Sequence, residues 1–78
     1  PSSFAEHNGT LIKFWQAQLC PEISGQPGEV VEADKNGVTV ACGSGAIRAT
    51  VLQRPGKPKM PAQSFLQGYA ISTGEYFK

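Results

Sequence analysis

Three cationic side chains lie close together between residues 54 and 59, and no acid interrupts them. They are Arg54, Lys57 and Lys59, and proline and glycine residues separate them. Each proline fixes its own φ and keeps the preceding residue out of the helical region, so this segment is predicted to be a stiff loop. A stiff loop with three cations indicates an anion-binding edge, and a solvated basic connector explains the same pattern equally well.

The other residue types indicate no catalytic or metal-binding set. The single histidine, His7, has no cysteine or carboxylate at metal-ligand spacing, so we expect a solvated histidine in a terminal segment. No second histidine is present to activate a serine or a cysteine, and Glu29, Glu32 and Asp34 crowd a predicted hairpin rather than a cleft. The sequence therefore predicts no catalytic residues and no metal ligands in this domain.

Length and composition describe one small globular domain covering residues 1–78. Hydrophobic residues make up 40% of the chain and charged residues 17%, which are ordinary values for a folded protein. No apolar run approaches the roughly 18 residues that span a bilayer, and no signal-peptide pattern is present. Cys20 and Cys42 are expected to be reduced thiols in the cytoplasm. The chain starts without methionine, so we expect it to be a piece of a longer protein.

The net charge of +1 conceals an uneven distribution. Residues 1–34 carry five acids and one lysine, whereas residues 35–78 carry six cations and one acid. If the fold gathers the second set on one side, the domain has a positive face. Such a face attracts a polyanion through phosphate contacts and counterion release.

Hydrophobic alternation and turn residues predict a series of short strands around the loop. A frayed segment over residues 1–9, with Phe4 as an anchor, leads into them. The expected strands are 10–19, 29–33, 38–42 and 46–52, with a last short one within 69–77. One helix is expected over residues 61–68, because Pro61 suits a first turn and Gly68 ends it. This succession predicts an all-β, small Greek-key (OB-like) barrel of five to six strands with one short helix. An SH3-like barrel is the alternative.

Alternation also predicts which side chains are buried. Both faces of the strand at 10–19 are largely apolar, with Ile12 and Phe14 on one side and Trp15 on the other, so Trp15 is expected in the core. In the strand at 38–42, the even-numbered residues should point inward and the odd-numbered ones outward. Arg48 projects outward from the middle of its strand.

The segment from Leu52 to Gly68 also matches a known pattern, L-Q-x-P-G-K-x-x-M-x-A-x-x-F-L-x-G. Further matches precede it in the same order, at residues 12–17, 27–31, 34–37 and 40–46. The chain thereby resembles the C-terminal domain of methionyl-tRNA formyltransferases over most of positions 9–69. One departure is Pro61, since the family usually has a serine there as the helix N-cap. Gln16 is another, at a position where the family often has arginine or lysine.

The resemblance implies a barrel-like accessory domain that helps to hold the initiator tRNA. It implies that a separate N-terminal domain of the same chain transfers the formyl group from 10-formyltetrahydrofolate, so no cofactor is expected here. A monomer that does not bind membranes is expected. The residues expected to contact tRNA phosphates are Arg48, Arg54, Lys57 and Lys59, with Lys13 and Lys35 as weaker candidates.

An alternative function remains open at this point. The chain is similar enough to related formyltransferases, acting on a folate or a nucleotide-sugar, that it could be a structural domain without RNA contact. The matches at Pro55-Gly56-Lys57 and Lys59-Met60 favour the tRNA-binding type. Aromatic platforms for single-stranded nucleic acid are not expected, since most aromatic residues are needed for the core.

Overall fold

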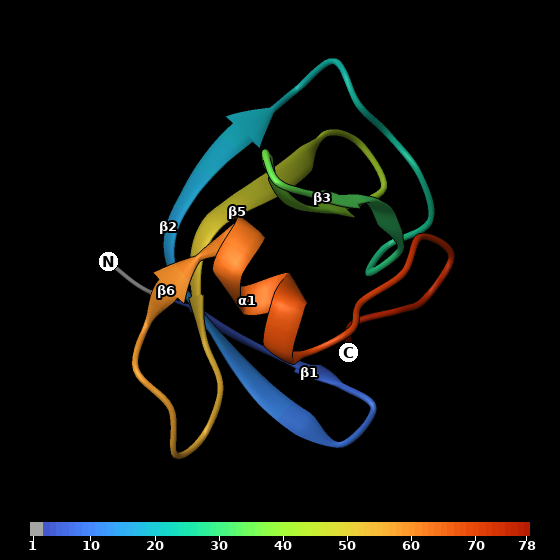
Figure 1. Cartoon of the computed structure of the whole chain (residues 1–78). Helices are drawn as coiled ribbons and strands as arrows, with labels where there is room; N and C mark the ends of the chain where they lie inside the picture. The colour runs from blue at the N-terminus through green and yellow to red at the C-terminus, as the bar shows by residue number, and fades with distance from the viewer. Residues whose placement is uncertain (1–2) are drawn as a thin grey trace.

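The computed structural model describes residues 3–78, and these form a mostly antiparallel β-structure with one short helix (Figure 1). Residues 1 and 2 of the predicted frayed segment lie outside this range. The elements, in chain order, are β1 (Ser3–His7), β2 (Thr10–Cys20), β3 (Val30–Asp34), β4 (Gly37–Ala41), β5 (Ala46–Gln53), β6 (Met60–Pro61) and α1 (Ala62–Gly68).

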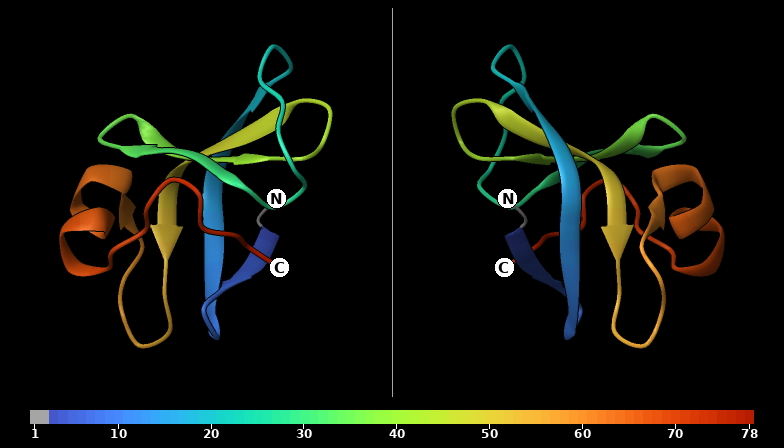
Figure 2. Two further views of the ribbon diagram at one scale, coloured as in Figure 1. Left: turned by 90° about the vertical axis from the view of Figure 1, so that its right-hand side faces the viewer. Right: turned by 90° about the vertical axis from the view of Figure 1, so that its left-hand side faces the viewer.

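The strands form one sheet in the order β1-β2-β5-β4-β3, and the short β6 pairs with the end of β5. All of these pairs are antiparallel. β2 and β3 are consecutive in the chain but do not pair, because β5 and β4 lie between them in the sheet. β3, β4 and β5 pair in the order in which they follow one another in the chain. The strongly twisted sheet wraps around the core, and α1 lies at one side of it (Figure 2).

The six antiparallel strands and the one short helix agree with the prediction, but the sheet is not closed, which corrects the prediction of a small Greek-key (OB-like) barrel. The C-terminal segment was expected to supply a closing strand, but it makes only isolated bridges, His7 with Phe77 and Glu29 with Tyr76. Its backbone bonds are divided between two partners: Phe77 N donates to Gly28 O at 2.8 Å, and Lys78 N donates to Glu6 O at 2.8 Å. A segment that changes partner after one or two residues cannot build a continuous ladder.

Apolar side chains from the sheet, the helix and the C-terminal segment meet in one core. Its buried members are Ile12, Phe14, Val30, Val38, Val40, Ala49, Leu52, Ala62, Phe65, Ile71 and Phe77. The helix contributes two of them and contacts β3, β4, β5 and β6. It begins after Pro61, which provides no side-chain cap, as the sequence predicts. The pairing of β6 with β5 just before this helix was not predicted.

The strand predictions hold for β2, β3, β4 and β5 to within about a residue or two at each end. The turn between β3 and β4 also agrees, because Asn36 N donates to the Asp34 carboxylate at 2.8 Å. The segment before β2 was predicted wrongly. Residues 3–7 are a regular strand, joined to β2 by the two-residue turn Asn8-Gly9, and Phe4 is 57% exposed rather than an anchor.

Two burial predictions are also wrong. In β4, the alternation fails because Thr39 and Ala41 are buried, while Cys42, just after the strand, is exposed. The reason is that Arg48 and Glu32 from the neighbouring strands hydrogen-bond to Thr39 and cover it. In β2, the face that carries Trp15 is not a second core surface, since Leu11 and Leu19 on this strand are 50% and 82% exposed.

His7 is buried, which corrects the expectation of a solvated side chain. It is 1% exposed, its Nδ1 lies 2.8 Å from the Tyr69 hydroxyl, and its Nε2 lies 2.7 Å from Glu75 Oε1. The Tyr69 hydroxyl donates to the carbonyl oxygen of His7 at 3.1 Å. The ring thus has a polar partner at each nitrogen, the Tyr69 hydroxyl at Nδ1 and the Glu75 carboxylate at Nε2. This network fastens β1 to the chain that follows α1.

Acid should weaken the network through Glu75. The backbone N–H of Ser72, and then the His7 ring, hold the pKa of Glu75 below its usual value. A group with a depressed folded-state pKa stabilises the fold above its unfolded pKa, about 4.3, and loses this effect as pH falls through the folded value. We expect urea denaturation to show a steeper loss of stability below about pH 5 for the wild-type domain than for Glu75→Gln. Parallel pH curves for the two proteins would contradict this.

Candidate nucleic-acid interface

The basic loop (residues 54–59) connects β5 to β6 and begins with a tight turn. Lys57 N donates to Arg54 O at 3.2 Å, Pro55 occupies the second position and Gly56 the third, with φ of 79°. This is the geometry of a type II turn, in which proline presets one φ and glycine permits the positive one. The predicted stiff loop is thus confirmed in its first half. It projects from the same end of the molecule as the turn between β1 and β2 (Figure 2).

A cation-aromatic group lies on the outer face of β2 beside this loop. The Nζ atom of Lys13 lies 4.0 Å from a Trp15 ring centroid, and the Nζ atom of Lys59 lies 4.5 Å from a Trp15 ring centroid. We call Trp15, Lys13 and Lys59 the Trp15 cluster. It joins a strand residue to the far end of the basic loop, so two cations that are distant in the sequence become neighbours.

Hydrogen bonds through Gln53 connect Trp15 to the basic loop. The Trp15 Nε1–H donates to Gln53 Oε1 at 2.7 Å, and Gln53 Nε2 donates to Lys57 O at 2.8 Å. Trp15 is also the additional residue of a β-bulge, because Phe14 pairs with Leu52 and Gln16 with Val51. Bulges redirect side chains and bend the strand.

Trp15 is partly buried, yet it is not a member of the core cluster. Its assignment to the core is therefore wrong, and sequence reasoning missed both Trp15 and Gln53 as parts of the candidate site. A local signal existed, because alternation places Lys13 on the same face of β2 as Trp15. A face that carries a lysine between two apolar residues is unsuited to the core.

The other predicted cations separate into different environments. Arg54 is partly buried, with its guanidinium 5.6 Å from the centre of the Tyr69 ring, so it faces the end of α1. Lys57 is exposed on the loop. Lys35 lies on the turn between β3 and β4. This turn and the basic loop lie at different sides of the molecule in both views of Figure 2.

Arg48 forms an ion pair with Glu32. Its Nη2 donates to Glu32 Oε1 at 3.0 Å and its Nε donates to Thr39 Oγ1 at 3.2 Å. The hydrogen bond to Glu32 is the main reason that the pKa of Arg48 is raised. The structure therefore brings Lys13 and Lys59 together on Trp15, with Lys57 and Arg54 on the same loop as Lys59. It leaves Arg48 and Lys35 outside this group.

Comparison with known proteins identifies the family of this chain. A family model described as "Formyl transferase, C-terminal domain" matches residues 1–70. The chain belongs to this family. The resemblance noted in the sequence is thereby confirmed.

Relatives of the formyl transferase C-terminal domain include proteins named methionyl-tRNA formyltransferase. The protein from Ralstonia nicotianae is 49% identical over 99% of this chain, and the chain covers 24% of that protein. The one from Herminiimonas arsenicoxydans is 43% identical over 97% of this chain, and the one from Nitrosomonas eutropha is 39% identical over 100%, each with 25% of its own length covered. The chain thus spans about a quarter of the length of these relatives.

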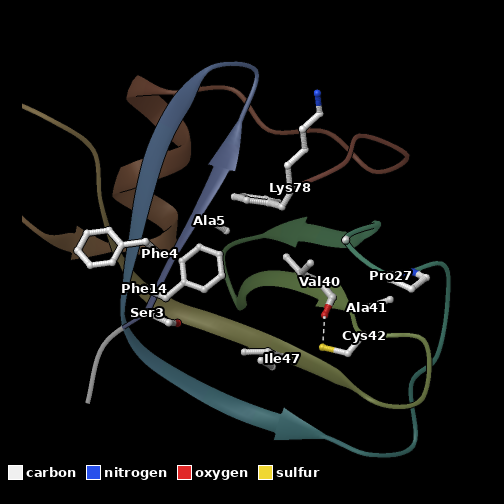
Figure 3. A pocket seen from close by; sticks show the side chains of 12 residues that line it. Ser3, Phe4, Ala5, Phe14, Pro27, Val40, Ala41, Cys42, Ile47 and Lys78 are labelled. Carbon is white, nitrogen blue, oxygen red and sulfur yellow. Dashed lines mark hydrogen bonds between the residues drawn. The ribbon is translucent and has the colours of Figure 1, made fainter.

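The formyl transferase C-terminal domain also has an apolar hollow, of about 560 Å³, between β1 and the strands β4 and β5 (Figure 3). Phe4, Phe14, Val40 and Ile47 contribute to its lining, together with Cys42 and Lys78. Across residues 3–78, no three potential metal ligands cluster, and no helix has the length and apolar character needed to cross a bilayer.

Proposed function

We propose that this chain is the tRNA-binding C-terminal domain of a methionyl-tRNA formyltransferase. It helps to position the initiator tRNA, while a separate catalytic domain transfers the formyl group from 10-formyltetrahydrofolate. The observation that carries the proposal is the group of cations at one end of the domain. Lys13 and Lys59 pack on Trp15 and Lys57 is exposed on the same loop as Lys59, and within residues 3–78 none of them forms an ion pair with an acid.

The chemistry of this group favours phosphates over bases. Lysine ammonium groups on a loop and on an outer strand face contact the sugar–phosphate backbone, which fixes position without reading sequence. A cluster without acidic partners keeps its full charge for the incoming polyanion, and release of counterions from the RNA then drives binding. The names of the relatives support tRNA as that polyanion.

Removing the loop lysines should weaken tRNA docking without slowing the chemistry. In the full-length enzyme, Lys57→Ala and Lys59→Ala should raise the apparent KM for initiator tRNA and leave kcat largely unchanged, because uniform binding is lost. Each substitution should also flatten the slope of log affinity against log salt by about one phosphate contact. Steady-state kinetics at several ionic strengths provide the measurement.

Lys35→Ala is the matched control, since it removes one lysine at a turn remote from the loop. It should leave the KM and the salt slope near their wild-type values. If Lys57→Ala and Lys59→Ala behave in the same way as this control, the loop is a connector and the domain is structural.

A further inference from the structure

We propose that Trp15 is a positioning residue that holds Lys13 and Lys59 together as a single binding site for one RNA phosphate. This inference rests on the proposed function and deepens it. It assigns a role to the indole ring, and it joins two lysines from different parts of the chain into one anion-binding site.

The ring explains how two ammonium groups remain close together. Lys13 and Lys59 lie 4.0 Å and 4.5 Å from the centre of a Trp15 ring, so both ammonium groups pack on the same indole side chain. Two like charges on one side chain repel each other, and long lysine side chains would otherwise spread into water. The negative face of an indole attracts each ammonium group and offsets this repulsion.

The ring itself is held in place. Its N–H donates to Gln53, and the same Gln53 amide donates to the Lys57 carbonyl in the basic loop. The amide therefore fixes the indole relative to the loop that carries Lys59. Because one glutamine contacts both parts, the position of the ring relative to the loop is set by the fold before RNA arrives. Such preorganisation lowers the entropy lost on binding.

The surroundings leave the double charge available to an anion. In the part of the chain that the structure describes, neither Lys13 nor Lys59 forms an ion pair. Lys13 instead lies 5.3 Å from the centre of the Phe4 ring, and the acid of β1 nearest to it in the register, Glu6, is opposite Leu11. An ammonium group that packs on a ring keeps N–H donors for other acceptors. A phosphate has enough oxygens to accept from both lysines.

The test is a set of binding measurements with initiator tRNA and the full-length enzyme, across a range of NaCl concentrations. Lys13→Met, Lys59→Met and their combination are made in the wild-type protein and again together with Trp15→Leu. In the wild type, the double lysine variant should lose much less tRNA affinity than the sum of the two single losses, because both lysines serve one phosphate.

Trp15→Leu should itself lower tRNA affinity about fivefold at low salt and flatten the salt slope. In its presence, the effects of the two lysine substitutions should shrink and become additive. Trp15→Phe retains an aromatic face and should keep most of the coupling. Leu19→Ala, at an exposed position near the far end of the same strand, is the control and should change nothing. Thermal melting shows that each variant is folded.

The outcomes separate this inference from the proposed function. If the lysine variants alter neither affinity nor salt slope, the tRNA-binding role fails and the inference fails with it. If they weaken binding but their coupling persists with Trp15→Leu, only the role of the ring is overturned. If Trp15→Leu weakens binding by the same factor at every salt concentration, the ring stacks on a base and does not position the lysines.

Discussion

Gly28→Ala is expected to lower the free energy of unfolding by about 3 kcal/mol, whereas Gly56→Ala should lower it by about 1 kcal/mol. Both glycines have a positive φ, 87° and 79°, which disfavours any other residue. They differ in their surroundings. A Cβ at Gly28 would overlap the carbonyl oxygen of Phe77, whereas nothing lies within 4 Å of a Cβ at Gly56.

The crowding at Gly28 follows from its position between two parts of the chain. Gly28 N donates to Ala41 O at 2.8 Å, and Gly28 O accepts from Phe77 N at 2.8 Å. A side chain there must push the C-terminal segment away, which strains these bonds and opens the core around Phe77. Gly56→Ala, in contrast, meets only the backbone preference for negative φ.

Urea denaturation of both variants measures the difference directly. Because the backbone penalty is common to both substitutions, the excess at Gly28 reports the contact with the C-terminal segment. Equal losses would show that this segment moves aside without cost and that it does not help to hold the sheet together.

Local signals predicted much of this fold. Alternation and turn residues located β2 to β5 and the turn at residues 34–37, and Gly68 located the end of α1. The same signals failed where long-range contacts decide the outcome. His7 finds its partners Tyr69 and Glu75 at sequence separations of 62 and 68 residues, and no local pattern contains that information. The open sheet has the same origin, because the C-terminal segment bonds to two partners in turn.

The candidate site was predicted only in part, because long-range contacts also decide which of its residues meet. The cations of the basic loop are adjacent in the sequence and were recognised at once. Arg48 was correctly placed on an outer strand face, but its pairing with Glu32 depends on strand neighbours that alternation cannot identify. Trp15 was assigned to the core because large aromatic residues are usually buried. The bulge at Trp15 and the two lysines that pack on its ring become visible only in three dimensions.

His7→Ala is expected to destabilise the domain by about 2–4 kcal/mol, a large loss for a residue near the start of the described chain. The substitution removes a buried ring and leaves a space among Tyr69, Phe77 and Glu75. It also removes the ring nitrogens that hydrogen-bond to the Tyr69 hydroxyl and to the Glu75 carboxylate. Because these partners follow α1, the loss should loosen the attachment of the C-terminal segment to β1.

Tyr69→Phe is the matched control, since it removes only the hydroxyl and keeps the aromatic ring in place. It should cost about 1 kcal/mol, the usual value for one hydrogen-bonding group, because the His7 carbonyl and Nδ1 each lose a partner. Urea denaturation gives the free energies, and hydrogen exchange at the amides of Glu6 and Lys78 reports the junction itself. If His7→Ala costs less than Tyr69→Phe and protection at these two amides is unchanged, the buried histidine does not hold the C-terminal segment to β1. In that case the backbone bonds between β1 and residue 78 would be sufficient by themselves.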